Sequence, residues 1–175
     1  MDAITLQYLI SLTVSEGQDM RLMDVVTTYL YGSIDTNLYI KIPEGFKLPE
    51  VTNPKPRNMY SIKLQRSLYL LKQFRRMWYN CLSEYLLKEG YVNNSICPCV
   101  FIKKSKFGLT IIAVYVDDLN LVGTLEELTK AANYLKKEFE MKDLGKTRYC
   151  LNLQIEHCSN DILVHQSTYI EKVLK

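Results

Sequence analysis

The sequence predicts an α+β fold in which an antiparallel sheet is backed by helices. Several segments place apolar residues at helical spacing. Between them lie short runs rich in branched residues, separated by little more than tight turns. Strands joined by tight turns pair antiparallel. With 175 residues the chain is long enough for one domain with a real core and short for two. We therefore predict a single domain over residues 1–175.

Four helices are expected. The first is predicted to begin without a capping residue, and the third opens with Thr124 and Glu127 at the spacing of a capping box. The second ends at Gly90, a usual helix stop. The predicted helices are Ala3–Glu16, Arg75–Glu89, Thr124–Phe139 and a last one that begins at Thr168.

Seven short strands are expected between and after these helices. The last two are predicted to form one hairpin around Ser159-Asn160-Asp161. Residues 47–58 contain three prolines and are predicted to form a long loop. The predicted strands are Arg21–Asp24, Tyr39–Ile42, Cys99–Lys103, Leu109–Val116, Leu119–Val122, Arg148–Glu156 and Ile162–His165.

Composition excludes several classes of protein. Apolar residues make up 47% and charged residues 23%, as in ordinary globular proteins. The sequence has neither an apolar run of membrane-spanning length nor a signal peptide, so we expect an intracellular protein that does not enter a membrane. The five cysteines include the C-x-C pair Cys97 and Cys99 but no C-x2-C spacing. Reduced thiols acting as small hydrophobic groups are favoured over a metal cluster of Cys150, Cys158 and the two histidines.

Charge is unevenly distributed along the chain. Residues 1–46 hold six acidic and two basic residues, whereas residues 51–80 hold seven basic residues and no acidic one. Five aromatic residues are interleaved with these bases. Basic groups neutralise phosphates and aromatic rings stack on bases, so residues 51–80 are suited to nucleic acid. A solvated basic surface over core aromatics is the alternative interpretation.

A pair of aspartates lies at a predicted hairpin tip, in Tyr115-Val116-Asp117-Asp118. Alone, this pair is equally consistent with a surface turn. Asp24, however, also ends a short predicted strand and is followed by apolar rather than polar residues. Three carboxylates from two strand ends can hold two Mg²⁺ ions, which can activate a primer hydroxyl and stabilise a leaving pyrophosphate.

Five blocks of the chain, in order and in spacing, resemble the reverse transcriptases of copia-type long-terminal-repeat retrotransposons. The hairpin tip matches the catalytic block of that family. A single Tyr-Val-Asp-Asp match would carry little weight, whereas five ordered blocks are specific. The blocks are Met23–Gly32, Tyr39–Phe46, Ser67–Tyr79, Tyr115–Asp118 and Phe139–Gly145.

The resemblance implies a polymerase palm and assigns site residues. Asp24, Asp117 and Asp118 would be the ligands of two Mg²⁺ ions, with Mn²⁺ as a substitute. Tyr29 stands at the steric-gate position that excludes a ribose 2′-hydroxyl. The residues expected near the incoming nucleotide and the template are Tyr69, Lys72, Gln73 and Arg76. The implied partners are an RNA or DNA template-primer and deoxynucleoside triphosphates, in cytoplasmic virus-like particles or the nucleus. The oligomeric state is left open.

The resemblance also implies a partial domain, truncated at both ends. It comprises the palm and part of its connection to the fingers, with the rest of the fingers before Ala3 and the thumb after Lys175. The family usually has Gly where Leu70 and Asn152 stand, and a side chain at a Gly position chosen for close approach would clash. Three functions stay open: an RNA-directed DNA polymerase fragment, expected to be inactive in isolation, an inactive remnant of a retroelement, and a non-catalytic nucleic-acid-binding module.

Overall fold

A computed structural model describes residues 1–28, 31, 37–48, 56–66, 74–159 and 161–174. Within it the chain divides into two compact units. The first comprises Met1–Val26 and Leu82–Lys175, and the second comprises Thr27–Cys81. No helix in the described ranges is long and apolar enough to cross a membrane.

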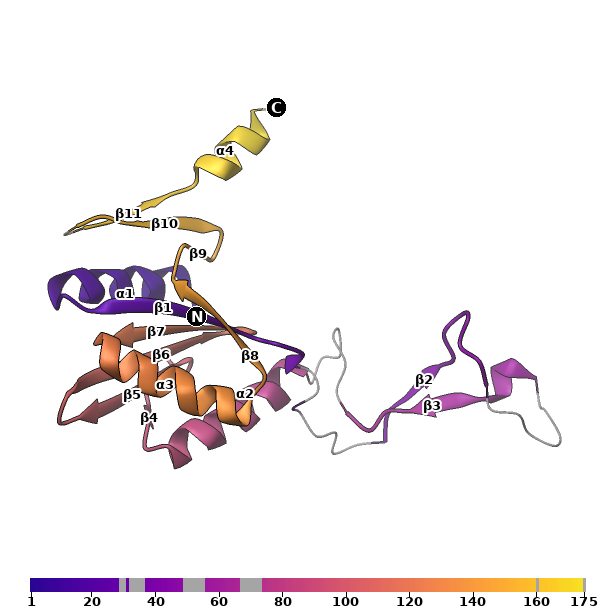
Figure 1. Ribbon diagram of the computed structural model, residues 1–175. Helices are drawn as coiled ribbons and strands as arrows, with labels where there is room; N and C mark the ends of the chain where they lie inside the picture. The colour runs from indigo at the N-terminus through magenta and orange to yellow at the C-terminus, as the bar shows by residue number, and fades with distance from the viewer. Residues whose placement is uncertain (29–30, 32–36, 49–55, 67–73, 160, 175) are drawn as a thin grey trace. The chain divides into compact units, whose positions relative to one another are not determined.

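The first unit is built on a six-stranded sheet in which all neighbouring strands pair antiparallel. In spatial order the strands are β4 (Val92–Asn93), β5 (Val100–Ser105), β6 (Gly108–Tyr115), β7 (Asp118–Gly123), β1 (Asp19–Val25) and β8 (Met141–Lys146). The predicted α+β class, an antiparallel sheet backed by helices, is confirmed (Figure 1). Strands β4 and β8, at the two edges of the sheet, were not predicted from the sequence.

Helices cover both faces of this sheet (Figure 1). Helix α1 (Ala3–Ser15) places Leu6 and Leu9 in one buried cluster with Met20 of β1 and Val122 of β7. Strand side chains alternate between faces, so a Cβ at Gly123 would lie on the opposite face, where it would meet Leu128 of α3 (Leu125–Glu138). The core is therefore a sheet between α1 on one side and α3 on the other.

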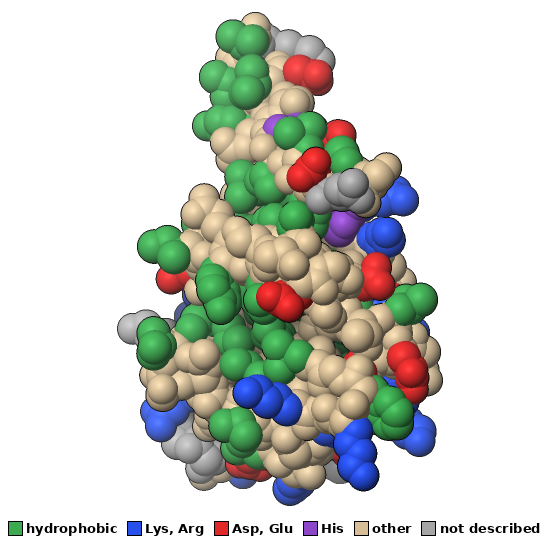
Figure 2. All heavy atoms as spheres, turned by 90° about the vertical axis from the view of Figure 1, so that its left-hand side faces the viewer, with side chains coloured by type: hydrophobic (Ala, Val, Ile, Leu, Met, Phe, Trp, Pro, Cys, Tyr) green, Lys and Arg blue, Asp and Glu red, His purple; other side chains and the backbone are tan. Residues whose placement is uncertain are grey.

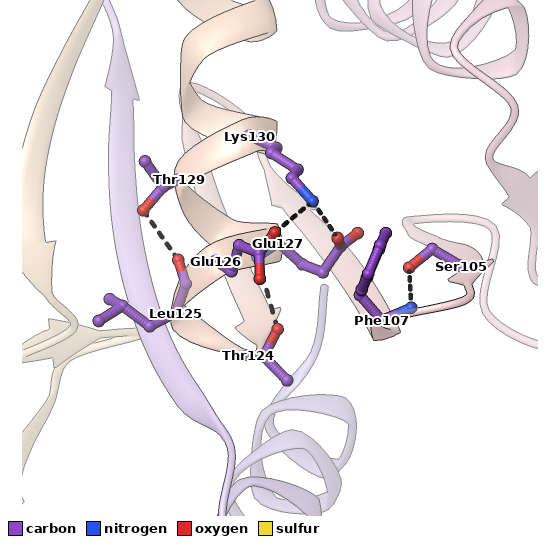
Figure 3. Close-up of polar contacts among 8 residues, drawn as sticks. All are labelled: Ser105, Phe107, Thr124, Leu125, Glu126, Glu127, Thr129 and Lys130. Atoms are coloured by element: carbon purple, nitrogen blue, oxygen red, sulfur yellow. Dashed lines mark hydrogen bonds and ion pairs between the residues drawn. The ribbon is translucent and has the colours of Figure 1, made fainter.

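The predicted absence of a cap on α1 is wrong. Asp2 has extended backbone geometry, and its side chain accepts a hydrogen bond from Thr5 N at 2.8 Å. An aspartate at this position satisfies one of the N–H groups that the first turn of a helix leaves unpaired. Helix α3 has the predicted cap, since Thr124 Oγ1 accepts from Glu127 N at 3.4 Å (Figure 3).

The predicted strand Arg148–Glu156 is also wrong, because a turn divides it. Strands β9 (Tyr149–Cys150) and β10 (Leu153–His157) pair antiparallel with each other. Leu151 and Asn152 between them have φ angles of 50° and 63°. Positive φ at both loop residues suits a two-residue hairpin, and asparagine tolerates that region better than most residues. The predicted hairpin of β10 with β11 (Ile162–His165) is confirmed, and α4 (Ser167–Val173) follows it.

Helix α2 (Phe74–Lys88) contains the boundary between the two units. In the first unit, Leu82 and Leu86 are buried, and Tyr85 Oη donates to Tyr134 O at 2.8 Å. In the second unit, the Trp78 ring lies 5.8 Å from the Tyr31 ring. That unit also contains strands β2 (Tyr39–Lys41) and β3 (Ser61–Lys63), which pair antiparallel, and a 3-10 helix (Arg57–Met59) within the predicted loop region.

An apolar groove of about 520 Å³ lies between α1 and strands β5 and β6 of the first unit. Its walls include Tyr8 and Leu12 from the helix, Ile102 and Leu109 from the strands, and Cys97 from the turn before β5. Figure 2 shows hydrophobic side chains gathered on the face of the molecule turned to the viewer.

Candidate active site

The β6–β7 hairpin positions two of the three predicted aspartates. Tyr115 ends β6 and pairs directly with Asp118, the first residue of β7, so the loop consists of Val116 and Asp117 alone. Val116 has a φ of 54°. For a branched side chain this left-handed geometry costs about 1–2 kcal/mol. Residues held in such strained conformations cluster at functional sites.

The third aspartate comes from the neighbouring strand. Asp24 of β1 pairs directly with Asp118 of β7. Side chains of directly paired residues lie on the same face of a sheet, with their Cβ atoms about 5 Å apart. Val25 N donates to Asp117 O at 3.0 Å, which continues the pairing into the hairpin loop. The structure thus brings all three predicted carboxylates to one end of two adjacent strands.

The electrostatics of this strand end favour a cation. Burial raises the pKa of the Asp118 carboxyl, and the negative charges of Asp24 and Asp117 raise it further. Repulsion of this kind is offset when a positive ion enters between the carboxylates. Carboxylate oxygens are the hard ligands that Mg²⁺ prefers. By donor chemistry and backbone placement, these residues fit such an ion.

The side chains themselves are not arranged as a finished metal site. Across the described ranges, no three His, Cys, Asp or Glu side chains are gathered into a metal-binding arrangement, so the aspartates are brought together by their backbone positions rather than by converging carboxylates. The cysteine–histidine cluster considered from the sequence is likewise not formed. His157 Nε2 lies 2.8 Å from Thr147 O, and His165 lies between Glu156 and Ser167.

The other predicted site residues lie elsewhere or are not described. Arg76 is exposed on α2, in the part of that helix that belongs to the second unit. The predicted contacts Tyr29, Tyr69, Lys72 and Gln73 lie outside the described residues.

Two features beside the aspartates were missed from the sequence. Lys142 of β8 pairs with Asp24 on the side away from Asp118, which extends the row of charged residues across three strands.

Asn120, two residues after Asp118, is fully buried. Thr147 Oγ1 donates to Asn120 Oδ1 at 3.2 Å, and Asn120 Nδ2 donates to Cys150 Sγ at 3.4 Å. A polar residue inside the apolar run Leu119–Val122 was the available signal for this network.

Comparison with known proteins identifies the family. All of residues 1–175 match the family model described as reverse transcriptase (RNA-dependent DNA polymerase). The chain is 34% identical over 175 residues to the Retrovirus-related Pol polyprotein from transposon TNT 1-94 of Nicotiana tabacum, covering 98% of this chain and 13% of that protein. It is 28% identical over 171 residues to the corresponding polyprotein from transposon RE1 of Arabidopsis thaliana, covering 97% of this chain and 11% of that protein.

Similarity also extends to yeast. The chain is 27% identical over 164 residues to the Transposon Ty1-DR1 Gag-Pol polyprotein of Saccharomyces cerevisiae, covering 93% of this chain and 9% of that protein. The chain thus spans only a small part of the length of these relatives. No solved structure matches it. The family match over residues 1–175 shows that the chain belongs to the reverse transcriptase family, of the kind found in the Pol polyproteins of copia-type retrotransposons.

Proposed function

We propose that this chain supplies the palm of an RNA-directed DNA polymerase, in which Asp24, Asp117 and Asp118 hold two Mg²⁺ ions. The direct pairing of Asp24 with Asp118, with Asp117 in the loop beside them, carries the proposal. The substrates would be a template-primer of RNA or DNA and deoxynucleoside triphosphates.

The chain's contribution to such a reaction is positioning. Bound metal ions would neutralise phosphate charge and lower the pKa of the primer hydroxyl. The three carboxylates would hold them, and the sheet would fix the spacing of the carboxylates. The hydrogen bond from Val25 N to Asp117 O ties the hairpin loop to β1, the strand that carries Asp24. In phosphoryl transfer most of the rate enhancement comes from positioning and charge stabilisation.

Substrate selection would fall to residues outside the aspartate site. By family resemblance, Tyr29 would exclude the ribose 2′-hydroxyl. Arg76, with Tyr69, Lys72 and Gln73, would contact the incoming nucleotide and the template. An exposed guanidinium such as that of Arg76 is suited to phosphate, because it donates several hydrogen bonds in a planar fork.

Binding of Mn²⁺ to the full chain, followed by isothermal titration calorimetry, tests the metal assignment. Saturable binding is expected for the wild type and should weaken at least tenfold in Asp117→Asn. Asp161→Asn removes an exposed carboxylate from the β10–β11 turn and should leave binding unchanged. Equal affinity of the wild type and Asp117→Asn would overturn the assignment.

Primer extension on poly(rA)/oligo(dT) tests catalysis by the chain itself. Incorporation above the level of Asp117→Asn, with Mg²⁺ or Mn²⁺, would show that the chain is an active polymerase. Equal signals from both proteins, together with aspartate-dependent Mn²⁺ binding, would place the chain as a metal-binding palm that needs other segments for activity.

A non-catalytic nucleic-acid-binding module is the second candidate. The observation that favours it is the adjacent exposed pair Arg75 and Arg76 near the start of α2. Binding that survives Asp117→Asn but weakens in Arg76→Ala would support it.

A further inference from the structure

The turn before β5 brings two thiols into contact. Val100 N donates to Cys97 O at 2.9 Å, which closes a four-residue turn from Cys97 to Val100. Pro98 stands at the second position of this turn, where its restricted φ is favourable. The sulfur atoms of Cys97 and Cys99 are 3.1 Å apart. The C-x-C spacing is thus folded into a side-by-side dithiol.

Neighbouring residues hold this turn in place through hydrogen bonds. Asn94 Oδ1 accepts from Cys97 N at 3.0 Å, and Asn93 Nδ2 donates to Pro98 O at 2.6 Å. On the other side, Thr5 Oγ1 of α1 lies 3.3 Å from Cys97 Sγ. The backbone is therefore ordered before any bond forms between the sulfurs, which reduces the entropy lost on ring closure.

The two thiols differ from the other three cysteines. Cys97 and Cys99 are half-buried, and Cys97 lines the apolar groove beside α1. Cys81 is also half-buried, Cys150 is buried and accepts a hydrogen bond from Asn120, and Cys158 is exposed, so burial alone does not set the pair apart. All five cysteines are free thiols, and among the residues that the structure describes the sulfur–sulfur contact is that of Cys97 with Cys99.

The two members of the pair also differ in acidity. Burial acts to raise the pKa of the Cys97 thiol, but hydrogen bonds with Thr5 and Cys99 outweigh burial and lower that pKa overall. Burial raises the pKa of the Cys99 thiol, and its hydrogen bond to Cys97 adds to this effect. The thiol with the lower pKa carries more thiolate and attacks first.

We propose that Cys97 and Cys99 form a redox-active dithiol that closes to an intramolecular disulfide by exchange with a small disulfide such as oxidised glutathione. The Cys97 thiolate attacks one sulfur of that disulfide, forms a mixed disulfide and releases one glutathione thiolate. The Cys99 thiolate then attacks Cys97 Sγ and releases the second glutathione. Two electrons pass from the protein thiols to the small disulfide, and the two thiol protons end on the two glutathione molecules.

The position of the dithiol connects it to the sheet that carries the aspartates. Val114 N donates to Cys99 O at 2.8 Å, and Val100 pairs with Ala113. Val114 immediately precedes Tyr115, the last residue of β6. The disulfide would therefore form next to β6, the strand that leads into the β6–β7 hairpin with Asp117 and Asp118.

Equilibration of the folded full chain in glutathione buffers of graded ratio, followed by acid quenching and peptide mass spectrometry, tests the proposal. The peptide containing residues 97–99 should become two hydrogen atoms lighter as oxidised glutathione increases, with a single midpoint. In urea the midpoint should shift several-fold toward higher oxidised glutathione, because the turn that aligns the sulfurs is lost. An unshifted midpoint in urea would show that the fold does not promote closure, and would overturn the proposal.

Single variants separate the two steps. Cys99→Ser removes the resolving thiol, so Cys97 should accumulate one glutathionyl group. Cys158→Ser should leave the midpoint unchanged. Proteins are compared by circular dichroism and thermal melting, so that a variant that fails to fold is recognised. Glutathionylation confined to Cys158, with Cys97 and Cys99 still open to alkylation in the folded wild type, would contradict the proposal. These measurements do not involve nucleotide incorporation or metal binding.

Discussion

At the scale of single residues, the aspartate site combines two interactions that destabilise the fold, namely charge repulsion and backbone strain. Three carboxylates share one strand end, and the charges of two of them raise the pKa of the third. The loop between them forces Val116 into a left-handed conformation that branched side chains avoid. Neither arrangement stabilises the sheet. Both are understandable if the strand end is built for a ligand rather than for stability.

Replacing one of these carboxylates should therefore stabilise the metal-free protein. Asp118→Asn is expected to increase the free energy of unfolding at pH 7 in the presence of a chelator. The gain should stay below about 1 kcal/mol, because solvent screens a half-buried group. Since the folded-state pKa of Asp118 is raised, its destabilising effect is present above that pKa and disappears as the pH falls toward the unfolded value of 3.8. The difference between variant and wild type should shrink over the same range in urea melts.

In the presence of divalent ions the wild type should become more stable than Asp118→Asn. Mg²⁺ should raise the melting temperature of the wild type and leave Asp118→Asn nearly unchanged, because the variant has lost one ligand. Asp161→Asn, the exposed control, should respond to Mg²⁺ as the wild type does. A lower stability of Asp118→Asn in chelator would show that this carboxylate makes a stabilising contact, which contradicts the electrostatic account.

At the scale of elements, a helix cap and ion pairs stabilise helix α3 and the edge strand β8. Helix α3 combines its Thr124 cap with acidic residues in the first turn and lysines in the last, which complements the helix dipole. The Lys130 ammonium lies 2.7 Å from a carboxylate oxygen of Glu126 and 3.0 Å from one of Glu127. Both ion pairs are drawn in Figure 3. Edge strand β8 is held to its neighbours by Asp143, which pairs with Arg21 of β1 and Lys136 of α3.

Removal of the α3 cap should destabilise the first unit modestly. Thr124→Ala leaves Glu127 N without its acceptor, and we expect a loss of about 0.5–1 kcal/mol in the free energy of unfolding. The matched control is Thr129→Ala, one turn further along the same helix, where Thr129 Oγ1 donates to Leu125 O and caps nothing. Its effect should stay within about 0.5 kcal/mol. Equal losses in urea denaturation would show that the cap is not a specific contribution.

Asp143 should give the stability a dependence on acid pH. Burial acts to raise the pKa of this carboxyl, but the hydrogen bonds from Gly145 N and Lys136 Nζ, together with the charge of Arg21, outweigh it and hold that pKa below 3.8. A lowered pKa stabilises the fold above 3.8 and loses that effect as the pH falls through the folded-state value. Asp143→Asn should therefore cost roughly 1 kcal/mol at pH 7 and little near pH 2. A pH-independent difference in urea melts would contradict this assignment.

Elements with strong periodicity could be predicted from the sequence, while those that depend on partners could not. The apolar residues at helical spacing in α3, and the runs of β-branched and other apolar residues in β6 and β7, predict a helix and two strands from the local sequence alone. Strand β8, with the sequence Met-Lys-Asp-Leu-Gly-Lys, has no such pattern, and its pairing with β1 and the ion pairs of Asp143 make it a strand. The turn at Leu151 and Asn152 was hidden because leucine rarely takes a positive φ. Its signal was Asn152, at a position where the family usually has Gly.

The candidate site was predictable for a similar reason. Asp24, Asp117 and Asp118 lie next to strongly periodic strands, so their placement at strand ends could be predicted from the sequence. The pairing of Asp24 with Lys142, and the contacts of Asn120 with Thr147 and Cys150, depend on register between segments distant in sequence. Register of that kind is set by tertiary packing rather than by local pattern.

At the scale of the whole molecule, charge is divided along the chain. The segment 51–80, with seven basic residues and no acidic one, contrasts with the acidic residues 1–46. Arg75 and Arg76 are exposed, as are Arg57 and Arg66. Clustered exposed bases bind nucleic acid mainly through phosphates, so such binding weakens with salt and is nearly independent of sequence.

Binding of single-stranded RNA or DNA should therefore depend on this segment. We expect Arg76→Ala to weaken binding of a fluorescein-labelled oligonucleotide in fluorescence anisotropy. Each lost phosphate contact should reduce the slope of log K against log salt concentration by about 0.7. Lys137→Ala removes an exposed base from α3, outside the basic segment, and should change neither affinity nor slope. Asp117→Asn should not weaken binding, since it removes negative charge. If Lys137→Ala and Arg76→Ala had equal effects, binding would follow net charge, and the basic segment would not be the nucleic-acid surface.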